Sequence, residues 1–237
     1  MASPRRRMRG CGRVAGEAAG PDGVPVRGGA TAAADPLCGP KYLVLGPLEL
    51  RRHGVPCTPT PRKLRALFAL LLLHANQPVA AEFLIDELWG GRPPRSAPSA
   101  LQMYVSGLRL VLDPGHRLAG GDARRHPVLR TSAAGYLLAV GPGELDLHVF
   151  RHRAARGREL LARGRRVAAG QTLRSALALW RGRPLGDLGR SGLPPYYAQR
   201  LTEERLAVQR DLRATLSGAS SSASAAAWAE PQESAGA

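Results

Sequence analysis

Residues 94–113 have the sequence PRSAPSALQMYVSGLRLVLD, and this stretch decides the fold. At about 100° per residue on a helical wheel, its large apolar side chains fall on one side and its short polar and basic side chains on roughly the opposite side. The apolar set is Leu101, Tyr104, Val105, Leu108 and Leu112; the polar set is Arg95, Ser99, Gln102, Ser106 and Arg109. The spacing predicts an amphipathic helix over residues 95–112 that packs its leucines against a core.

The polar side of this helix suits the major groove of DNA. Arginine can bond a guanine edge or a phosphate, glutamine an adenine edge, and serine either. We therefore expect all five polar side chains of the helix to lie at a DNA surface. An ordinary surface helix whose polar side meets only water has the same pattern, so the neighbouring segments have to decide.

The segments before the helix predict a small sheet and two further helices. Strand-like runs at Tyr42–Leu45 and Leu48–Leu50 are separated by a Gly-Pro break, and a third short strand follows. Leucines and a phenylalanine then repeat with helical spacing over residues 61–76, and a second helix is expected over Glu82–Trp89.

The segment after the helix predicts a hairpin, with arms at Val128–Thr131 and Tyr136–Val140. Strands, three helices and a hairpin, in this order, are typical of a winged helix, whose third helix contacts DNA. The hairpin would be the wing. Three arginines near it could bond phosphate or a narrow minor groove: Arg124, Arg125 and Arg130.

The second half of the chain predicts three helices, over residues 145–166, 171–182 and 195–216. Paired antiparallel helices of this kind look like tetratricopeptide repeats. The expected core positions are Leu147, Phe150, Ala154, Leu160, Leu161, Leu173, Leu177, Trp180, Tyr197, Leu201, Leu206 and Leu212.

These segments predict an α+β chain with four parts: a winged helix-turn-helix domain, an all-α tetratricopeptide-like domain and a tail at each end. The winged helix spans residues 41–142 and the helical domain residues 145–216. Residues 1–40 are rich in Arg, Gly and Ala, and residues 217–237 in Ser and Ala. Such segments bury too little apolar surface to order themselves, so we expect both to be disordered.

The composition favours a polyanionic partner. The chain has 34 basic and 18 acidic residues, a net charge of +16, although a GC-rich genome also raises arginine content. Three cysteines without metal-type spacing indicate a reducing compartment, and no apolar run reaches membrane-spanning length, so we expect a cytoplasmic protein. His148 and His152 lack a third ligand nearby, and no catalytic motif occurs, so we expect neither metal, cofactor nor enzymatic activity.

Several segments in the right order resemble one family: KYLVLGPLEL, PRKLRALFALLLLHAN, LIDELWG, PPRSAPSALQMYVSGLRLVL, GYLLAV and DLHVF. They are similar to the Streptomyces antibiotic regulatory proteins, which pair a winged helix of the response-regulator effector type with a bacterial transcriptional activation domain. The resemblance implies an activator of antibiotic biosynthesis genes that binds tandem direct repeats as a side-by-side dimer, recruits RNA polymerase and is associated with the nucleoid. It also implies that Gln102, Ser106 and Arg109 face DNA, with Arg95 and Ser99 near the helix start.

The chain departs from this family at some positions. The family usually has basic residues where Gly107 and Leu110 stand and a polar residue where Met103 stands. Its activation domain is also longer, so we expect this one to be shortened. The alternative hypothesis is therefore a degenerate member that acts as a non-specific basic nucleic-acid-binding protein or as a protein-interaction module.

Overall fold

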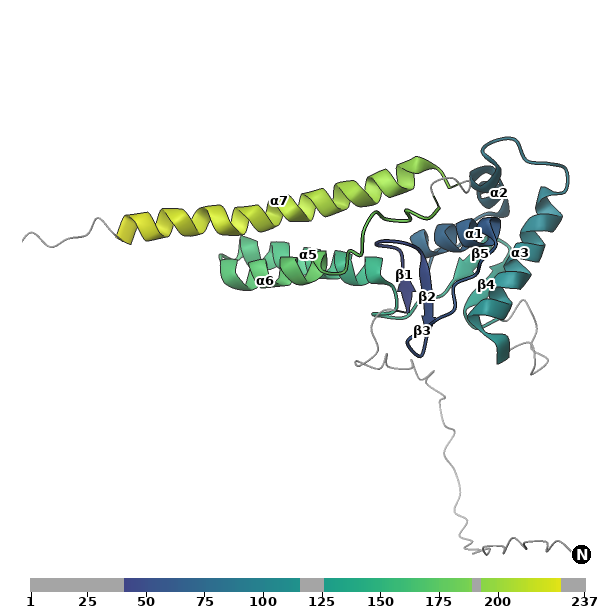
Figure 1. Ribbon diagram of the computed structural model, residues 1–237, viewed down its shortest axis with the longest axis horizontal. Coiled ribbons are helices and arrows are strands. Elements are labelled where there is room, and N and C mark those ends of the chain that lie inside the picture. Colours follow the sequence, from purple (N-terminus) through teal and green to yellow (C-terminus); the bar gives the residue numbers. More distant parts are fainter. Residues whose placement is uncertain (1–40, 116–125, 189–192, 227–237) are drawn as a thin grey trace, which may run out of the picture. The chain divides into compact units, whose positions relative to one another are not determined.

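The computed structural model describes residues 41–115, 126–188 and 193–226, with side chains up to Ser217 (Figure 1). The described residues all belong to one compact unit. Along the described chain, a three-stranded sheet and three helices are followed by a two-stranded hairpin and three more helices. This order confirms the predicted class, a winged helix followed by a helical domain.

The small sheet consists of β1 (Tyr42–Leu43), β2 (Glu49–Arg52) and β3 (Val55–Pro56), paired antiparallel in this order. The turn between β2 and β3 lies at Gly54, whose φ of +79° suits glycine. Tyr42 is fully buried and meets the ring of Phe68 edge-on at 6.0 Å, which fixes the sheet against the first helix.

The three helices of the first half share one core. They are α1 (Arg62–Leu73), α2 (Ala81–Trp89) and α3 (Ala97–Leu112). Their predicted apolar faces are confirmed, since Leu67, Leu84 and Leu108 are each completely buried. Helix α2 ends at Gly90, which takes the left-handed conformation, and the chain then turns into α3.

The hairpin of β4 (Leu129–Ser132) and β5 (Gly135–Leu138) confirms the predicted wing. Main-chain bonds between Val79 and Tyr136, 2.8 and 2.9 Å long, attach β5 to the link between α1 and α2. The side chain of Asn76 bonds both the N–H and the C=O of Val140, at 2.8 and 3.0 Å. The wing is therefore held at the end of α1 as well as beside α3.

The second half consists of α5 (Asp146–Ala162), α6 (Arg166–Leu177) and α7 (Pro195–Ala226). Helix α6 begins five residues before the predicted start at residue 171. Gly164, with φ +72°, makes the turn, whereas Gly170 lies inside α6, where a Cβ atom would be 3.2 Å from Thr215 Oγ1. Gly170 thus lies at a close contact between α6 and α7 and not at a turn.

Helix α7 contacts its neighbours through a stripe that includes Tyr197, Leu201, Val208 and Thr215. The prediction that Leu206 lies in the core is wrong: its side chain is 51% exposed, because it is about 200° around the helix from Val208. The helix continues to Ala226, ten residues past its predicted end and into the segment expected to be disordered. That segment is rich in alanine, the best helix former. Residues 1–40 and 227–237 lie outside the described residues.

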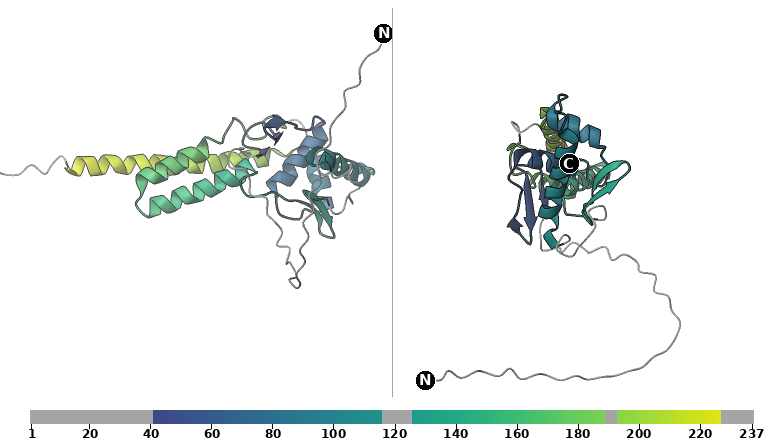
Figure 2. Two further views of the ribbon diagram at one scale, coloured as in Figure 1. Left: turned by 90° about the horizontal axis from the view of Figure 1, so that it is seen from below. Right: turned by 90° about the vertical axis from the view of Figure 1, so that its right-hand side faces the viewer.

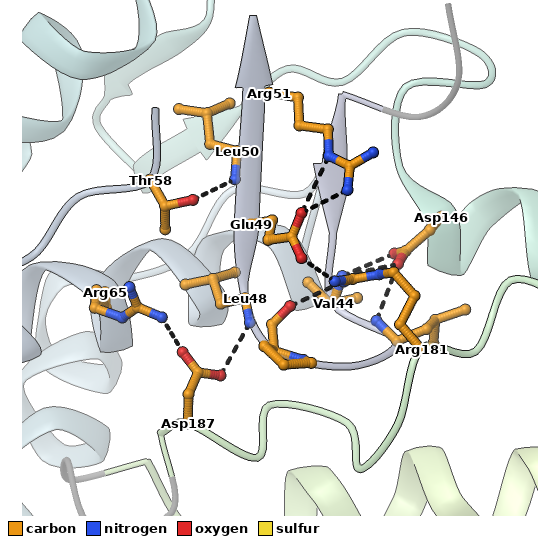
Figure 3. A network of polar contacts seen from close by, with 12 residues as sticks. Val44, Leu48, Glu49, Leu50, Arg51, Thr58, Arg65, Asp146, Arg181 and Asp187 are labelled. Carbon is orange, nitrogen blue, oxygen red and sulfur yellow. Dashed lines mark hydrogen bonds and ion pairs between the residues drawn. The ribbon is translucent and has the colours of Figure 1, made fainter. Parts of the chain in front are cut away.

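The two halves are joined through the turn between β1 and β2 (Figure 3). The main-chain N–H groups of Val44 and Leu45 donate to the carboxylate of Asp146, at 2.9–3.0 Å. On the other side of the turn, the N–H of Leu48 donates to Asp187, at 2.9 Å, and Asp187 also pairs with Arg65. Main-chain bonds from Arg181 to Leu45 and from Leu185 to Gly46 complete the contact.

Asp146 is the most buried carboxylate among the described residues, 1% exposed at the start of α5. Burial raises its pKa to about 6, although the N–H groups of Val44 and Leu45 and the charge of Arg181 oppose this change. The guanidinium of Arg181 lies 4.0 Å away and also pairs with Glu49. The carboxylate thus contacts both halves from a site with little access to water.

Candidate nucleic-acid interface

Helix α3 presents a polar outer face. Ser99, Gln102 and Ser106 are exposed there, and Arg95 is exposed in the turn before the helix. None of the sixteen residues of α3 is acidic. The face is therefore free of carboxylates that would repel phosphate, as the helical wheel predicted.

The α2–α3 contact fixes the orientation of α3. The rings of Trp89 and Tyr104 stack at 6.3 Å with an interplanar angle of 26°, and the ammonium of Lys63 lies 5.2 Å from the centre of the Trp89 ring. Arg52, from β2, donates to the carbonyl of Val111 near the C-terminal end of α3. The helix is thus held at its middle and near its C-terminal end, while Ser99, Gln102 and Ser106 stay in solvent.

Arg109 lies beside the wing and not at the centre of the exposed face. Its Nε donates to the carbonyl of Leu129, at 3.0 Å, and its Nη2 donates to Thr131 Oγ1, at 2.6 Å. The side chain is half-buried. Arg109 therefore ties α3 to β4, and Figures 1 and 2 show the helix and the hairpin side by side.

His126 supports the same junction between α3 and β4. It is 2% exposed, and its Nδ1 accepts from the N–H groups of Val128 and Leu129, at 3.2 and 3.0 Å. Two donors at Nδ1 require the proton on Nε2, which faces the carbonyl of Arg109 at 3.3 Å. A neutral histidine thus joins the end of α3 to the start of β4.

The structure describes one of the three contact residues that the sequence predicts near the wing. Arg130 is exposed on β4, opposite Leu137 of β5. Arg124 and Arg125 lie outside the described residues. Of the eight predicted site residues, the structure therefore places five on or before α3 and one on the wing.

Three other residues matter for this surface that the sequence did not single out: His126, Asn76 and Gly135. Each links the wing to a helix or to the α1–α2 link. At Gly135, with φ +115°, a Cβ atom would lie 2.0 Å from the carbonyl oxygen of Val79. The available signals were a histidine just before the predicted hairpin and a glycine at its turn, but the contacts with Arg109 and Val79 join segments that are separate in the sequence.

The family departures lie on two sides of α3. Met103 and Leu110 are exposed, to 64% and 40%. Gly107 lies over the side chain of Leu64, with 3.5 Å between its ideal Cβ position and Leu64 Cδ1. Met103 and Leu110 thus belong to the candidate interface, whereas Gly107 belongs to the packing beneath it.

No helix among the described residues is both long and apolar enough to cross a membrane. Within the same residues, no three His, Cys, Asp or Glu side chains gather in a way that could hold a metal ion.

Two protein families match the chain. The bacterial transcriptional activator domain matches residues 145–231. The family described as "Transcriptional regulatory protein, C terminal" matches residues 56–120, which include the three helices α1 to α3.

Individual relatives match across both halves. Regulatory protein DnrI of Streptomyces peucetius is 38% identical over 169 residues, which are 70% of this chain and 60% of that protein. Transcriptional regulator RedD of Streptomyces coelicolor is 32% identical over 71% of this chain and 47% of that protein. The solved structure of Mycobacterium tuberculosis EmbR in complex with a low affinity phosphopeptide matches with a TM-score of 0.64 and 34% identity, covering 71% of this chain and 43% of that chain. The chain thus spans 43–60% of these relatives.

Proposed function

Because the chain belongs to the Streptomyces antibiotic regulatory protein family of transcriptional regulators, which are not enzymes, we propose that it is a sequence-specific DNA-binding activator of antibiotic biosynthesis genes. The observation that carries this proposal is the exposed face of α3, which presents Ser99, Gln102 and Ser106, lacks carboxylates and lies beside an arginine-bearing hairpin. A protein of this function would be found with the nucleoid in the cytoplasm.

In the proposed complex, α3 enters the major groove and the hairpin lies on the adjacent backbone. Gln102 and Ser106 contact base edges, and Arg95 and Ser99 contact DNA near the helix start. Two bonds from Arg109 to β4 support a positioning role, in which this side chain sets the distance between helix and wing.

Arg130 contacts phosphate in this proposal, and its exposure on β4 supports that role. Arg124 and Arg125 are included in the proposed phosphate contacts on the strength of the sequence alone.

The proposal extends to assembly and activation. Two copies bind tandem direct repeats side by side, and the helical domain recruits RNA polymerase, as the family resemblance implies. Gel shifts on DNA with one repeat or two give the stoichiometry directly. Transcription in vitro, with RNA polymerase holoenzyme and the repeats upstream of a promoter, measures activation; equal transcript with and without the chain contradicts recruitment.

The first test selects bound sequences from a random duplex library and compares the selected site with a scrambled duplex of the same composition. Gln102→Ala should lower affinity for the selected site by about 5–150-fold, since one bidentate base contact contributes about 1–3 kcal/mol. It should leave affinity for the scrambled duplex unchanged. Gln171→Ala, an exposed glutamine on α6, is the matched control and should bind as the parent chain does.

The second test separates base contacts from phosphate contacts. Arg130→Ala should weaken binding to both duplexes alike and reduce the slope of log affinity against log salt by about 1. Arg174→Ala removes an exposed charge from α6 and should leave that slope unchanged. Equal affinity of the parent chain for the selected and scrambled duplexes would instead support the non-specific basic protein and refute the specific activator.

A further inference from the structure

The residues of α3 that lie directly opposite its buried face are not its most polar residues. The buried side chains centre on Leu101, Leu108 and Leu112. At about 100° per residue, the direction opposite to them falls on a line of four residues spaced by four, three and four positions. These residues are Ser99, Met103, Ser106 and Leu110.

Gln102 and Arg109 lie to one side of this line, toward the wing. The bonds from Arg109 to Leu129 and Thr131 of β4 show on which side the wing lies. In a helix seated in a groove, the side chains opposite its supporting core reach deepest. Met103 and Leu110 therefore occupy the positions at which base edges would be met first.

Both side chains are apolar and in contact with water, Met103 to 64% and Leu110 to 40%. In the major groove, the apolar group that a base edge offers is the C5-methyl of thymine. We propose that Met103 and Leu110 each contact a thymine methyl group, so that α3 recognises DNA in part through two thymines. This inference rests on the proposed function, because it concerns the same surface.

The spacing of the two residues sets the spacing of the thymines. Seven residues of α-helix span about 10.5 Å. In zinc fingers, helix positions −1, 3 and 6 contact three successive bases, so seven residues correspond to about two or three base pairs. The two methyl groups should therefore lie in the major groove about two or three base pairs apart.

The surroundings of the two side chains favour DNA over a protein partner. Two apolar side chains separated by one serine are a small area compared with a stable protein interface. Arg95 is exposed in the turn before α3, and α3 itself has no acidic residue. A polyanion with small apolar groups in its groove matches this combination.

The test replaces thymine with uracil, which removes the C5-methyl and keeps the base-pairing groups. Each thymine of the duplex selected by the full chain is changed singly, and the dissociation constant is measured by fluorescence anisotropy at one salt concentration. The parent chain should lose about fourfold in affinity at each of two positions, the loss expected for one buried methyl group.

Variants assign the two positions. Met103→Ala should bind thymine and uracil equally at one position and keep the loss at the other, and Leu110→Ala should do the reverse. Gln102→Ala should keep both losses although its affinity is lower. Val167→Ala, which shortens an apolar side chain 78% exposed on α6, should behave as the parent chain. Because the replaced side chains are exposed, urea denaturation should give nearly unchanged midpoints.

The outcomes distinguish this inference from the proposed function. If a specific duplex is selected but no uracil position matters, or if both alanine variants keep both losses, the methyl contacts are refuted and sequence-specific binding stands. If selection yields no preferred sequence, the proposed function fails, and the methyl contacts fail with it.

Discussion

Two glycines in the middle of helices should respond in opposite ways to the same change. Gly107 lies in α3 and Gly157 in α5. Alanine has the higher helix propensity at both positions, by about 0.5–1 kcal/mol. What differs is the space that the added methyl group would occupy.

At Gly107, the new methyl group would make ordinary contacts with Leu64, at 3.5 and 3.7 Å. Gly107→Ala should therefore raise the free energy of unfolding by about 0.5–1.5 kcal/mol, from helix propensity and added apolar contact. At Gly157, the methyl group would lie 2.5 Å from Leu173 Cδ2 and 2.6 Å from its Cγ.

Leu173 is completely buried, so it has little room to move away. Overpacking of this kind costs about 1–3 kcal/mol, which exceeds the gain in propensity, and Gly157→Ala should therefore lower the free energy of unfolding by up to about 2.5 kcal/mol. Urea denaturation followed by circular dichroism at 222 nm measures both changes in one series. Changes of the same sign in the two variants would refute the packing argument, and a stabilised Gly157→Ala would refute the close contact between α5 and α6.

Three further predictions concern the junctions between elements. Burial raises the pKa of Asp146 to about 6 from its ordinary 3.8, so between these pH values the folded chain binds a proton that the unfolded chain does not. The contribution of Asp146 to the free energy of unfolding should therefore fall by about 3 kcal/mol as the pH rises from 3.8 to 6. The difference in free energy of unfolding between the parent chain and Asp146→Asn, measured from pH 4 to 7, should show this fall; a difference independent of pH contradicts it. Gly135→Ala should cost at least about 1–3 kcal/mol because of its positive φ and the carbonyl of Val79, and should speed amide exchange in the hairpin; unchanged exchange counts against the assigned anchor. Thr131→Val removes an acceptor of Arg109 and should weaken binding to all duplexes alike, with a stability change of at most about 1.5 kcal/mol; a loss confined to the selected duplex would mean that Thr131 contacts bases.

The parts of the fold that follow helical or strand periodicity could be predicted from the sequence. The apolar stripe of α3 is an example, since Leu101, Val105 and Leu108 are all buried as expected. The exposed positions of Ser99 and Gln102 follow from the same wheel. Periodicity is a property of one segment, so no knowledge of distant partners was needed.

The parts that depend on distant partners could not be predicted. Asp146 begins a helix, where a carboxylate is ordinary, and nothing in its neighbours indicates that it accepts bonds from residues about 100 positions earlier. The bonds of Arg109 to β4 depend on how the wing packs against α3, which the sequence of α3 does not contain. Leu206 is a typical core residue by type, but it lies on the side of α7 that faces solvent. Which side of α7 is buried depends on the helices that pack against it.

The hydrogen bonds that the second half makes to the β1–β2 turn determine whether the two halves can be separated. The polypeptide crosses from one half to the other near residues 142–145. The N–H groups of Leu45 and Leu48, both buried, donate to Asp146 and Asp187, which lie after that point in the chain. A fragment that ended there would leave these N–H groups without acceptors, and it would expose apolar side chains at the edge of its sheet to water. Through Asp187 and Arg65, the same bonds reach α1, on which α3 packs, so a shift of the helical domain would be transmitted mechanically to α3.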